Sequence, residues 1–205
     1  TSGEYRLDGI SVRTMSKPQR AVLRNRKIGF VFQSYNLLPK TTAVENVELP
    51  LMYNSSVSAS ERRRRAIEAL QAVGLGDRLE HKSNQMSGGQ MQRVWLALAI
   101  AQSREVLLLD EITTYLDIRY QYEILNLIKT LNRSFGTSVV MVLHDINQTL
   151  QYADATIVMK DGRAVYQGRT QDVMTENMIK EIYGITSEMI YVKTNKYCLF
   201  HENSL

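Results

Sequence analysis

Residues 86–93 read Met-Ser-Gly-Gly-Gln-Met-Gln-Arg, and this stretch is the most informative in the chain. Apolar residues at helical spacing follow it, so we expect a helix over about 88–102 that begins at the glycines. The N-terminus of a helix presents backbone N–H groups and the positive end of its dipole, to which Ser87 adds a hydroxyl. Such a turn suits a phosphate group, although the same residues taken alone would equally suit a surface turn.

Polar residues also stand directly after three apolar segments that read as strands. The strands are expected at 28–32, 105–109 and 138–143. The polar residues are Gln33 after the first, Asp110 and Glu111 after the second, and His144 after the third. Ligands bind outside the carboxyl ends of the strands in an open α/β sheet, so we expect these four side chains to converge at one sheet edge.

Asp110 and Glu111 have the chemistry that phosphoryl transfer to water needs. In that reaction a protein mostly positions the nucleophile and stabilises charge. One carboxylate can hold Mg²⁺, usually through its water shell, and the next can act as general base on the attacking water. An acidic loop after a strand is the alternative interpretation, and the surrounding motifs weigh against it.

The order of these segments resembles the nucleotide-binding domain of ABC transporters. By this resemblance Asp110 is the Walker B aspartate that holds the metal, and Glu111 is the catalytic glutamate. Gln33 resembles the Q-loop glutamine, whose amide oxygen coordinates the metal or its water. His144 resembles the switch histidine that contacts the γ-phosphate. Asp117 resembles the aspartate of the D-loop, which crosses between two such domains.

Ser87, Gly88, Gly89 and Gln90 match the signature motif of the same family. In the family this motif binds the γ-phosphate of a nucleotide held by the opposite subunit, which implies a head-to-tail pair of domains. The resemblance further implies ATP and Mg²⁺ as cofactors, transmembrane permease subunits as partners, and a cytoplasmic position at the inner face of the cell membrane. A substrate-binding protein is a further candidate partner, and no nucleic acid is expected.

The expected fold class is α/β, with a P-loop NTPase-like, mostly parallel sheet core and an inserted helical subdomain, the N-terminal part of the fold being absent. We expect residues 1–33 in the core, 34–100 in the helical subdomain with the signature motif, and 101–205 in the rest of the core and a C-terminal tail. Continuous apolar strands indicate burial on both faces of the sheet. Further helices are expected at 18–26, 58–73, 118–133, 146–153 and 170–183, and a hairpin turn at Asp161-Gly162.

Composition sets limits on the class of protein. The chain has 205 residues and a formal net charge of +4, which does not by itself indicate nucleic acid binding. No apolar stretch is long enough to span a bilayer, and no secretory leader is visible. The single cysteine, Cys198, cannot form an internal disulfide. The basic run at 62–65 reads either as a phosphate-binding patch or as a solvated helix face, and the helical spacing behind it favours the second interpretation.

Two features depart from the family pattern. The sequence contains no G-x-x-x-x-G-K-[ST] phosphate loop. We therefore expect that this chain alone, or a homodimer of it, hydrolyses ATP very poorly, and that it is either a fragment or a truncated product. Ile112 follows the catalytic glutamate where the family usually has proline. Its free φ angle and additional N–H are expected to loosen the turn that holds Glu111.

The resemblance is divided between two groups of transporters. Residues 28–93 resemble the macrolide-export and lipoprotein-release group, and residues 95–205 resemble the iron–siderophore importer group. The transported substrate stays open, because the membrane subunits choose the cargo in both groups. Two other functions compete with transport: a soluble ABC-type ATPase acting on ribosomes or DNA, and a non-catalytic regulatory partner that retains the fold.

Overall fold

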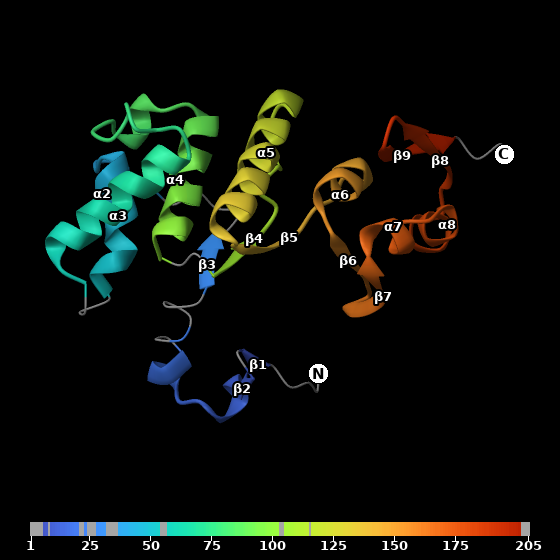
Figure 1. Ribbon diagram of the computed structural model, residues 1–205, viewed down its shortest axis with the longest axis horizontal. Coiled ribbons are helices and arrows are strands. Elements are labelled where there is room, and N and C mark those ends of the chain that lie inside the picture. The colour runs from blue at the N-terminus through green and yellow to red at the C-terminus, as the bar shows by residue number, and fades with distance from the viewer. Residues whose placement is uncertain are drawn as a thin grey trace. The chain divides into compact units, whose positions relative to one another are not determined.

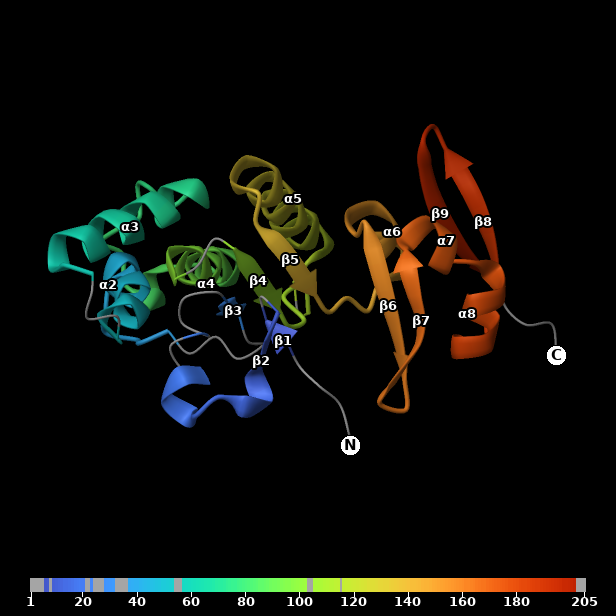
Figure 2. The ribbon, with the colours of Figure 1, turned by 60° about the horizontal axis from the view of Figure 1, so that its bottom comes forward.

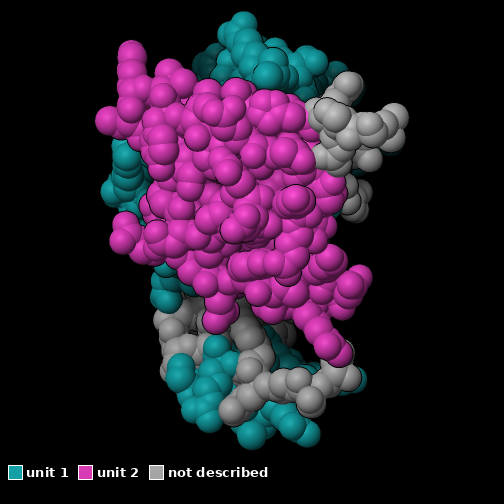
Figure 3. Space-filling view, turned by 90° about the vertical axis from the view of Figure 1, so that its right-hand side faces the viewer, with its two compact units in different colours: residues 1–142 teal, residues 143–205 magenta. Residues whose placement is uncertain are grey.

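The computed structural model describes residues 6–7, 9–20, 23, 28–31, 37–53, 57–102, 105–114 and 116–201. The chain divides into two compact units, Thr1–Val142 and Leu143–Leu205, which Figure 3 colours teal and magenta. This division does not test the boundaries expected after residues 33 and 100.

A parallel sheet forms the centre of the first unit (Figure 1). Its strands, in spatial order, are β3 (Ile28–Val31), β4 (Val106–Leu109) and β5 (Ser138–Met141). Leu109 pairs with Val31 on one side and Met141 on the other, so the three carboxyl ends lie level with one another. The expected parallel direction is therefore present in the part of the sheet that carries the carboxylates.

The helical region forms one packed group within the first unit. Its elements are α2 (Ala43–Glu48), η2 (Leu49–Tyr53), α3 (Ala59–Ala72), η3 (Ser83–Gln85) and α4 (Gly88–Gln102). Thr42 begins α2 with a complete capping box to Glu45, and Ser58 caps α3. The α2, α3 and α4 helices share a core of fully buried side chains, among them Val44, Leu70 and Val94. Each such side chain contributes about 1.5–3 kcal/mol by leaving water.

The α5 helix (Ile118–Phe135) packs against β5, and Figure 2 shows the two elements alongside each other. Gly136 ends the helix in the left-handed region at φ 66°, where glycine has no Cβ penalty. Asn132 then donates from Nδ2 to the carbonyl of Thr137 at 2.7 Å, which fixes the turn into β5. At the N-terminal end of the unit, β1 (Arg6–Leu7) and β2 (Ile10–Ser11) form a short antiparallel pair followed by η1 (Val12–Thr14).

The second unit has its own core between helices and two antiparallel hairpins. Its elements are α6 (Ile146–Tyr152), β6 (Ala155–Lys160), β7 (Arg163–Arg169), α7 (Thr170–Val173), α8 (Glu176–Tyr183), β8 (Thr186–Val192) and β9 (Asn195–His201). Leu150, Met178 and Ile179 lie at the centre of the core. Asp161 (φ 50°) and Gly162 (φ 73°) form the two-residue turn of the β6–β7 hairpin, as expected.

The side chain of Asn147 makes an unusual contact with β9. Its Oδ1 accepts from the backbone N–H of Cys198 at 2.8 Å, and its Nδ2 donates to the carbonyl of Cys198 at 3.1 Å. Both backbone groups of one strand residue are therefore satisfied by a single side chain of α6. This double contact fastens α6 to the C-terminal hairpin.

Two expectations about the helices and strands are wrong. The helix expected over 170–183 is interrupted, because Thr175 is extended and caps α8 by accepting from the N–H of Met178. Burial of the strands on both faces is also not observed: the exposed fractions of Val140 and Ile157 are 59% and 63%. An apolar run shows that a strand suits a buried position, but it does not specify which layer covers each face. Among the described strands, β6 pairs only with β7.

Candidate functional site

The Ser-Gly-Gly-Gln turn forms the first turn of α4, as the sequence predicts. Ser87 and Gly88 are exposed, so the turn lies on the surface of its own unit. Ser87 Oγ accepts from the N–H of Gln90 at 3.2 Å, and Gln90 Oε1 accepts from the N–H of Ser87 at 3.0 Å. The N–H groups of Gly88 and Gly89 fall in the first turn, where a helix has no internal acceptors for them. These groups and the helix dipole form a surface suited to an anion.

Contacts with α5 hold this end of α4 in place. A Cβ built on Gly89 would lie 3.2 Å from Cδ1 of Tyr120, so the aromatic ring already covers that glycine. Arg93 forms an ion pair with Glu123 at 3.0 Å, and Arg119 bonds the same carboxylate at 2.9 Å. The hydrogen bond from Arg119, reinforced by the charges of both arginines, lowers the pKa of Glu123 below its ordinary value. The phosphate-suited turn is thus attached to a second helix.

Asp110 and Glu111 follow β4 directly, at the carboxyl edge of the parallel sheet. Asp110 is exposed and Glu111 is half-buried. Glu111 has φ 50°, a left-handed conformation that costs a non-glycine residue about 1–3 kcal/mol. The turn after it is closed by the N–H of Thr114, which donates to the carbonyl of Glu111 at 3.1 Å. Ile112 is buried, with an exposed fraction of 6%.

The buried side chain of Gln92 reaches this turn from α4. Its Nε2 donates to the carbonyl of Ile112 at 3.3 Å. The Ile112–Thr113 peptide, one residue beyond Glu111, is therefore held from the helix whose first turn is Ser87–Gln90.

The two carboxylates fit a magnesium ion by the chemistry of their donors. Mg²⁺ prefers hard oxygen ligands and usually keeps several waters, so one or two carboxylates together with substrate phosphates are sufficient. Among the described residues no group of three or more histidine, cysteine, aspartate or glutamate side chains could hold a metal ion. The arrangement therefore suits a metal held jointly with a phosphate ligand.

Asp117 stands at the N-cap of α5 without making a side-chain cap hydrogen bond, and its side chain is exposed. The residue before it is fixed, because Gln121 donates from Nε2 to the carbonyl of Leu116 at 2.9 Å. The D-loop interpretation of Asp117 stays a prediction.

Gln33 lies outside the described residues, so the Q-loop prediction stays open. Residues 38–42, further along the chain, are fixed by Asn46, which is 3% exposed. Its Oδ1 accepts from the N–H of Leu38 at 2.8 Å, and its Nδ2 donates to Oγ1 of Thr41 at 2.7 Å and to the carbonyl of Thr42 at 2.9 Å.

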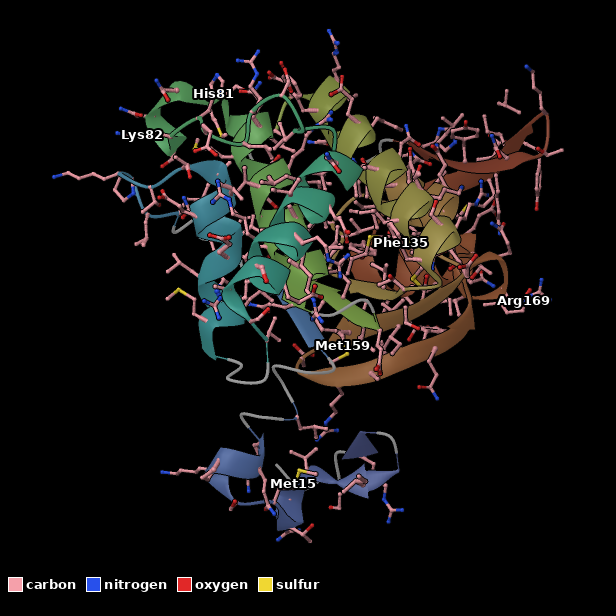
Figure 4. The ribbon with its side chains drawn as sticks, turned by 60° about the vertical axis from the view of Figure 1, so that its left-hand side comes forward. Met15, His81, Lys82, Phe135, Met159 and Arg169 are labelled. Carbon is pink, nitrogen blue, oxygen red and sulfur yellow. The ribbon has the colours of Figure 1, made fainter. Side chains whose placement is uncertain are left out.

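The Ser83 hydroxyl donates to the carbonyl of Leu38 at 3.0 Å, and a β-bridge joins Thr42 to Lys82, which Figure 4 labels beside His81. Residues 38–42 are thereby connected to the η3 turn that precedes Ser87–Gln90.

His144 belongs to the second unit, whereas Asp110 and Glu111 belong to the first. His144 is exposed and precedes Asp145, which caps α6 by accepting from the N–H of Gln148 at 2.8 Å. The strand before it ends beside the carboxylates, since the N–H of Val142 donates to the carbonyl of Leu109 at 2.9 Å. The convergence of His144 with Asp110 and Glu111 stays a prediction.

The basic run on α3 is largely neutralised by its own neighbours. Arg64 and Arg65 both bond Glu61, at 2.9 Å and 2.7 Å, and Arg63 bonds Glu80 at 2.9 Å. This pairing supports the solvated helix face and weighs against a phosphate-binding patch.

Sequence reasoning missed three residues that shape the site: Asn46, Gln92 and Tyr120. Gln92 had a readable signal, because it shares a helical stripe with the buried Leu96 and Ile100, where a polar residue needs a partner. Asn46 similarly lies between the buried Val44 and Val47. Tyr120 carried no comparable signal, because its contact with Gly89 depends on how α5 packs on α4, which no local pattern shows.

Comparison with known proteins identifies the family. A family model described as "ABC transporter" matches residues 1–114, more than half of the chain. The chain belongs to the ABC transporter family. An uncharacterized ABC transporter ATP-binding protein of Thermotoga maritima is 48% identical over 163 residues, which cover 80% of this chain and 68% of the relative. A macrolide export ATP-binding/permease protein, MacB, of Pasteurella multocida is 42% identical over 94% of this chain and 29% of its own length. The chain thus spans only part of each relative.

Solved structures show the same fold. A dimeric ATP-binding cassette in a post-hydrolysis state, bound to ADP and Pi, superposes with a TM-score of 0.71. It is 40% identical, and the match covers 83% of this chain and 74% of that one. A metal-chelate type transporter matches with the same TM-score at 24% identity, which shows the fold alone. The protein is therefore an ABC ATPase domain with the expected P-loop NTPase fold, and it is the ATP-binding component of a transporter.

Proposed function

We propose that this domain binds MgATP in a head-to-tail dimer and couples its hydrolysis to transport through membrane-spanning permease subunits. The position of Glu111 carries the proposal. It stands in a strained turn at the carboxyl end of β4, next to the exposed Asp110, where a metal and a water can reach both carboxylates. Asp110 would hold Mg²⁺, and Glu111 would take a proton from the attacking water.

The surface turn at Ser87–Gln90 supports the dimer, because an anion-binding turn that points away from its own unit needs a ligand held by another one. The solved relatives named as dimeric cassettes support the same assembly. The MacB relatives carry a permease in the same chain, which supports membrane partners. No described helix of this chain is long and apolar enough to cross a membrane.

For the cargo we favour export of the macrolide or lipoprotein type. Three MacB relatives at 40–42% identity support it. The resemblance of residues 107–118 to the iron–siderophore importer group leaves import of a ferric siderophore as the competing function. Transport assays with both cargo classes separate the two: ATP-dependent accumulation of a macrolide in inside-out vesicles supports export, and ferric-siderophore uptake in the opposite orientation overturns it.

Hydrolysis is tested on the full-length gene product with Glu111→Gln. Removing a general base is expected to lower ATP turnover about 10²- to 10⁴-fold while ATP binding is retained. Glu105→Gln is the matched control, because Glu105 is an exposed acid immediately before β4. Equal turnover in wild type and Glu111→Gln would exclude the assigned role. A wild-type protein that does not bind MgATP would exclude the proposed function as a whole.

A further inference from the structure

The backbone of Glu111 needs support from outside its own turn. A left-handed conformation in a non-glycine residue persists only where the surroundings determine it. The turn itself supplies the bond from Thr114 N–H to the Glu111 carbonyl, at 3.1 Å. Thr114 Oγ1 lies a further 3.5 Å from Oε2 of Glu111, at the limit of a hydrogen bond. These bonds close the turn from within, and a bond from another element adds to their hold.

Gln92 supplies such a bond from α4. Its Nε2 lies 3.3 Å from the carbonyl oxygen of Ile112, the residue after Glu111. Both residues have exposed fractions of only 6%, so water does not compete for the bond. A buried carbonyl that lost this donor would need another partner or a shift of the backbone.

The helix that carries Gln92 is itself held firmly. Arg93, the next residue, bonds Glu123 on α5 at 3.0 Å and the carbonyl of Val73 at 3.3 Å. One turn earlier, Gly89 lies against the ring of Tyr120. Gln92 therefore reaches from a fixed point of α4 to the Ile112 carbonyl, one residue beyond Glu111.

We propose that Gln92 is a positioning residue for Glu111, holding its turn so that the carboxylate meets the attacking water. Gln92 acts through the Ile112 carbonyl and does not touch the substrate. The role rests on the proposed function of Glu111 as general base. The proposed role also means that the residue holding the Glu111 turn lies on α4, the helix that begins with the signature motif.

Gln92→Met tests the proposal in the full-length gene product, because methionine keeps the length and volume of the side chain and removes the donor. We expect ATP turnover to fall at least about tenfold with the Michaelis constant for ATP changed less than twofold, the pattern of an interaction needed in the transition state. Gln102→Met, at the last residue of the same helix, is the matched control and should leave both constants unchanged.

A double-mutant cycle separates positioning from a general structural effect. In a Glu111→Gln background, Gln92→Met should have no further effect on single-turnover hydrolysis, since it acts through the missing carboxylate. An undiminished tenfold loss in that background would overturn the proposal.

Hydrogen exchange provides a readout that does not depend on hydrolysis. The amide of Thr114, which closes the turn, should exchange at least about tenfold faster in Gln92→Met than in Gln102→Met. Unchanged exchange at Thr114 would overturn the proposal whether or not the protein hydrolyses ATP. Faster exchange in a protein without ATPase activity would instead refute the proposed function and leave the role of Gln92 in holding the turn supported.

Discussion

Replacing Asn46 with alanine should destabilise the first unit strongly. The side chain makes three hydrogen bonds shorter than 3.0 Å, to the N–H of Leu38, to Oγ1 of Thr41 and to the carbonyl of Thr42. A protein hydrogen bond contributes about 1 kcal/mol net, so removing all three is expected to cost about 3 kcal/mol of unfolding free energy. At a urea dependence of about 2 kcal/mol/M, the unfolding midpoint would move down by about 1.5 M.

Trp95 provides the assay. It is the single tryptophan of the chain and lies half-buried on α4, so its fluorescence during urea unfolding reports on the first unit. Asn84→Ala is the matched control, because Asn84 is an exposed asparagine in the neighbouring η3 turn and should change the unfolding free energy by less than about 0.5 kcal/mol.

Asn46→Asp sharpens the test, because it keeps the acceptor for Leu38 and loses the donor to Thr42. At pH 7 the aspartate would place a buried negative charge against the Thr42 carbonyl, so it should be less stable than Asn46→Ala. Burial raises the folded pKa of this carboxyl, so the Asp variant should recover stability as the pH falls. An Asn46→Ala midpoint equal to that of Asn84→Ala would refute the reasoning.

Three further results are expected. Gly136→Ala should lose about 1 kcal/mol in urea unfolding, because φ is 66° and no heavy atom lies within 4 Å of the added Cβ, so that only backbone strain opposes it. Cys198 is buried and its burial raises the pKa of the thiol, so a thiol reagent at pH 8 should label it on the order of a hundredfold more slowly in the folded protein than in urea. The pKa of Glu123 is lowered chiefly by its hydrogen bond from Arg119, so this carboxylate stabilises the fold above pH 4.5, the ordinary glutamate value, and the stabilisation is lost as the pH falls below it. An acid titration followed by Trp95 fluorescence should therefore show a smaller loss of stability in Glu123→Gln than in the wild type.

Each of these has its own control. Gly136→Asn should recover most of the loss, because asparagine tolerates the left-handed region, and equal losses for both variants would contradict the strain argument. Fast labelling of Cys198 in the folded protein would contradict its burial. Identical acid profiles for wild type and Glu123→Gln would show that the carboxylate pairs too weakly to matter.

Most elements of the fold were predictable because their signals are local. The helix at 88–102 begins where Ser87 can cap it, and the turn at Asp161-Gly162 has the two positive φ angles that this dipeptide favours. The break at Thr175 was missed although threonine is a good N-cap, because the apolar spacing on both sides of it continues as in one helix.

The candidate site was predictable at the level of positions. The places of Asp110 and Glu111 at a strand end follow from the apolar run before them, and β4 ends there as expected. The strained φ of Glu111 and the bond from Gln92 to Ile112 were not predictable, because these two bonded residues lie 20 apart in the sequence and meet only through the packing of α4. Local patterns therefore located the candidate carboxylates, and tertiary contacts set the geometry of their turn.

The double contact between Asn147 and Cys198 has a consequence beyond fastening α6. A two-stranded hairpin such as β8–β9 exposes unpaired backbone groups along its outer edge, which a strand from another molecule could join. At Cys198 both of those groups are already occupied by the asparagine amide, which occupies the position that an intruding strand would take. The asparagine therefore prevents a strand of another molecule from pairing with β9 at this position, which disfavours self-association into extended sheets.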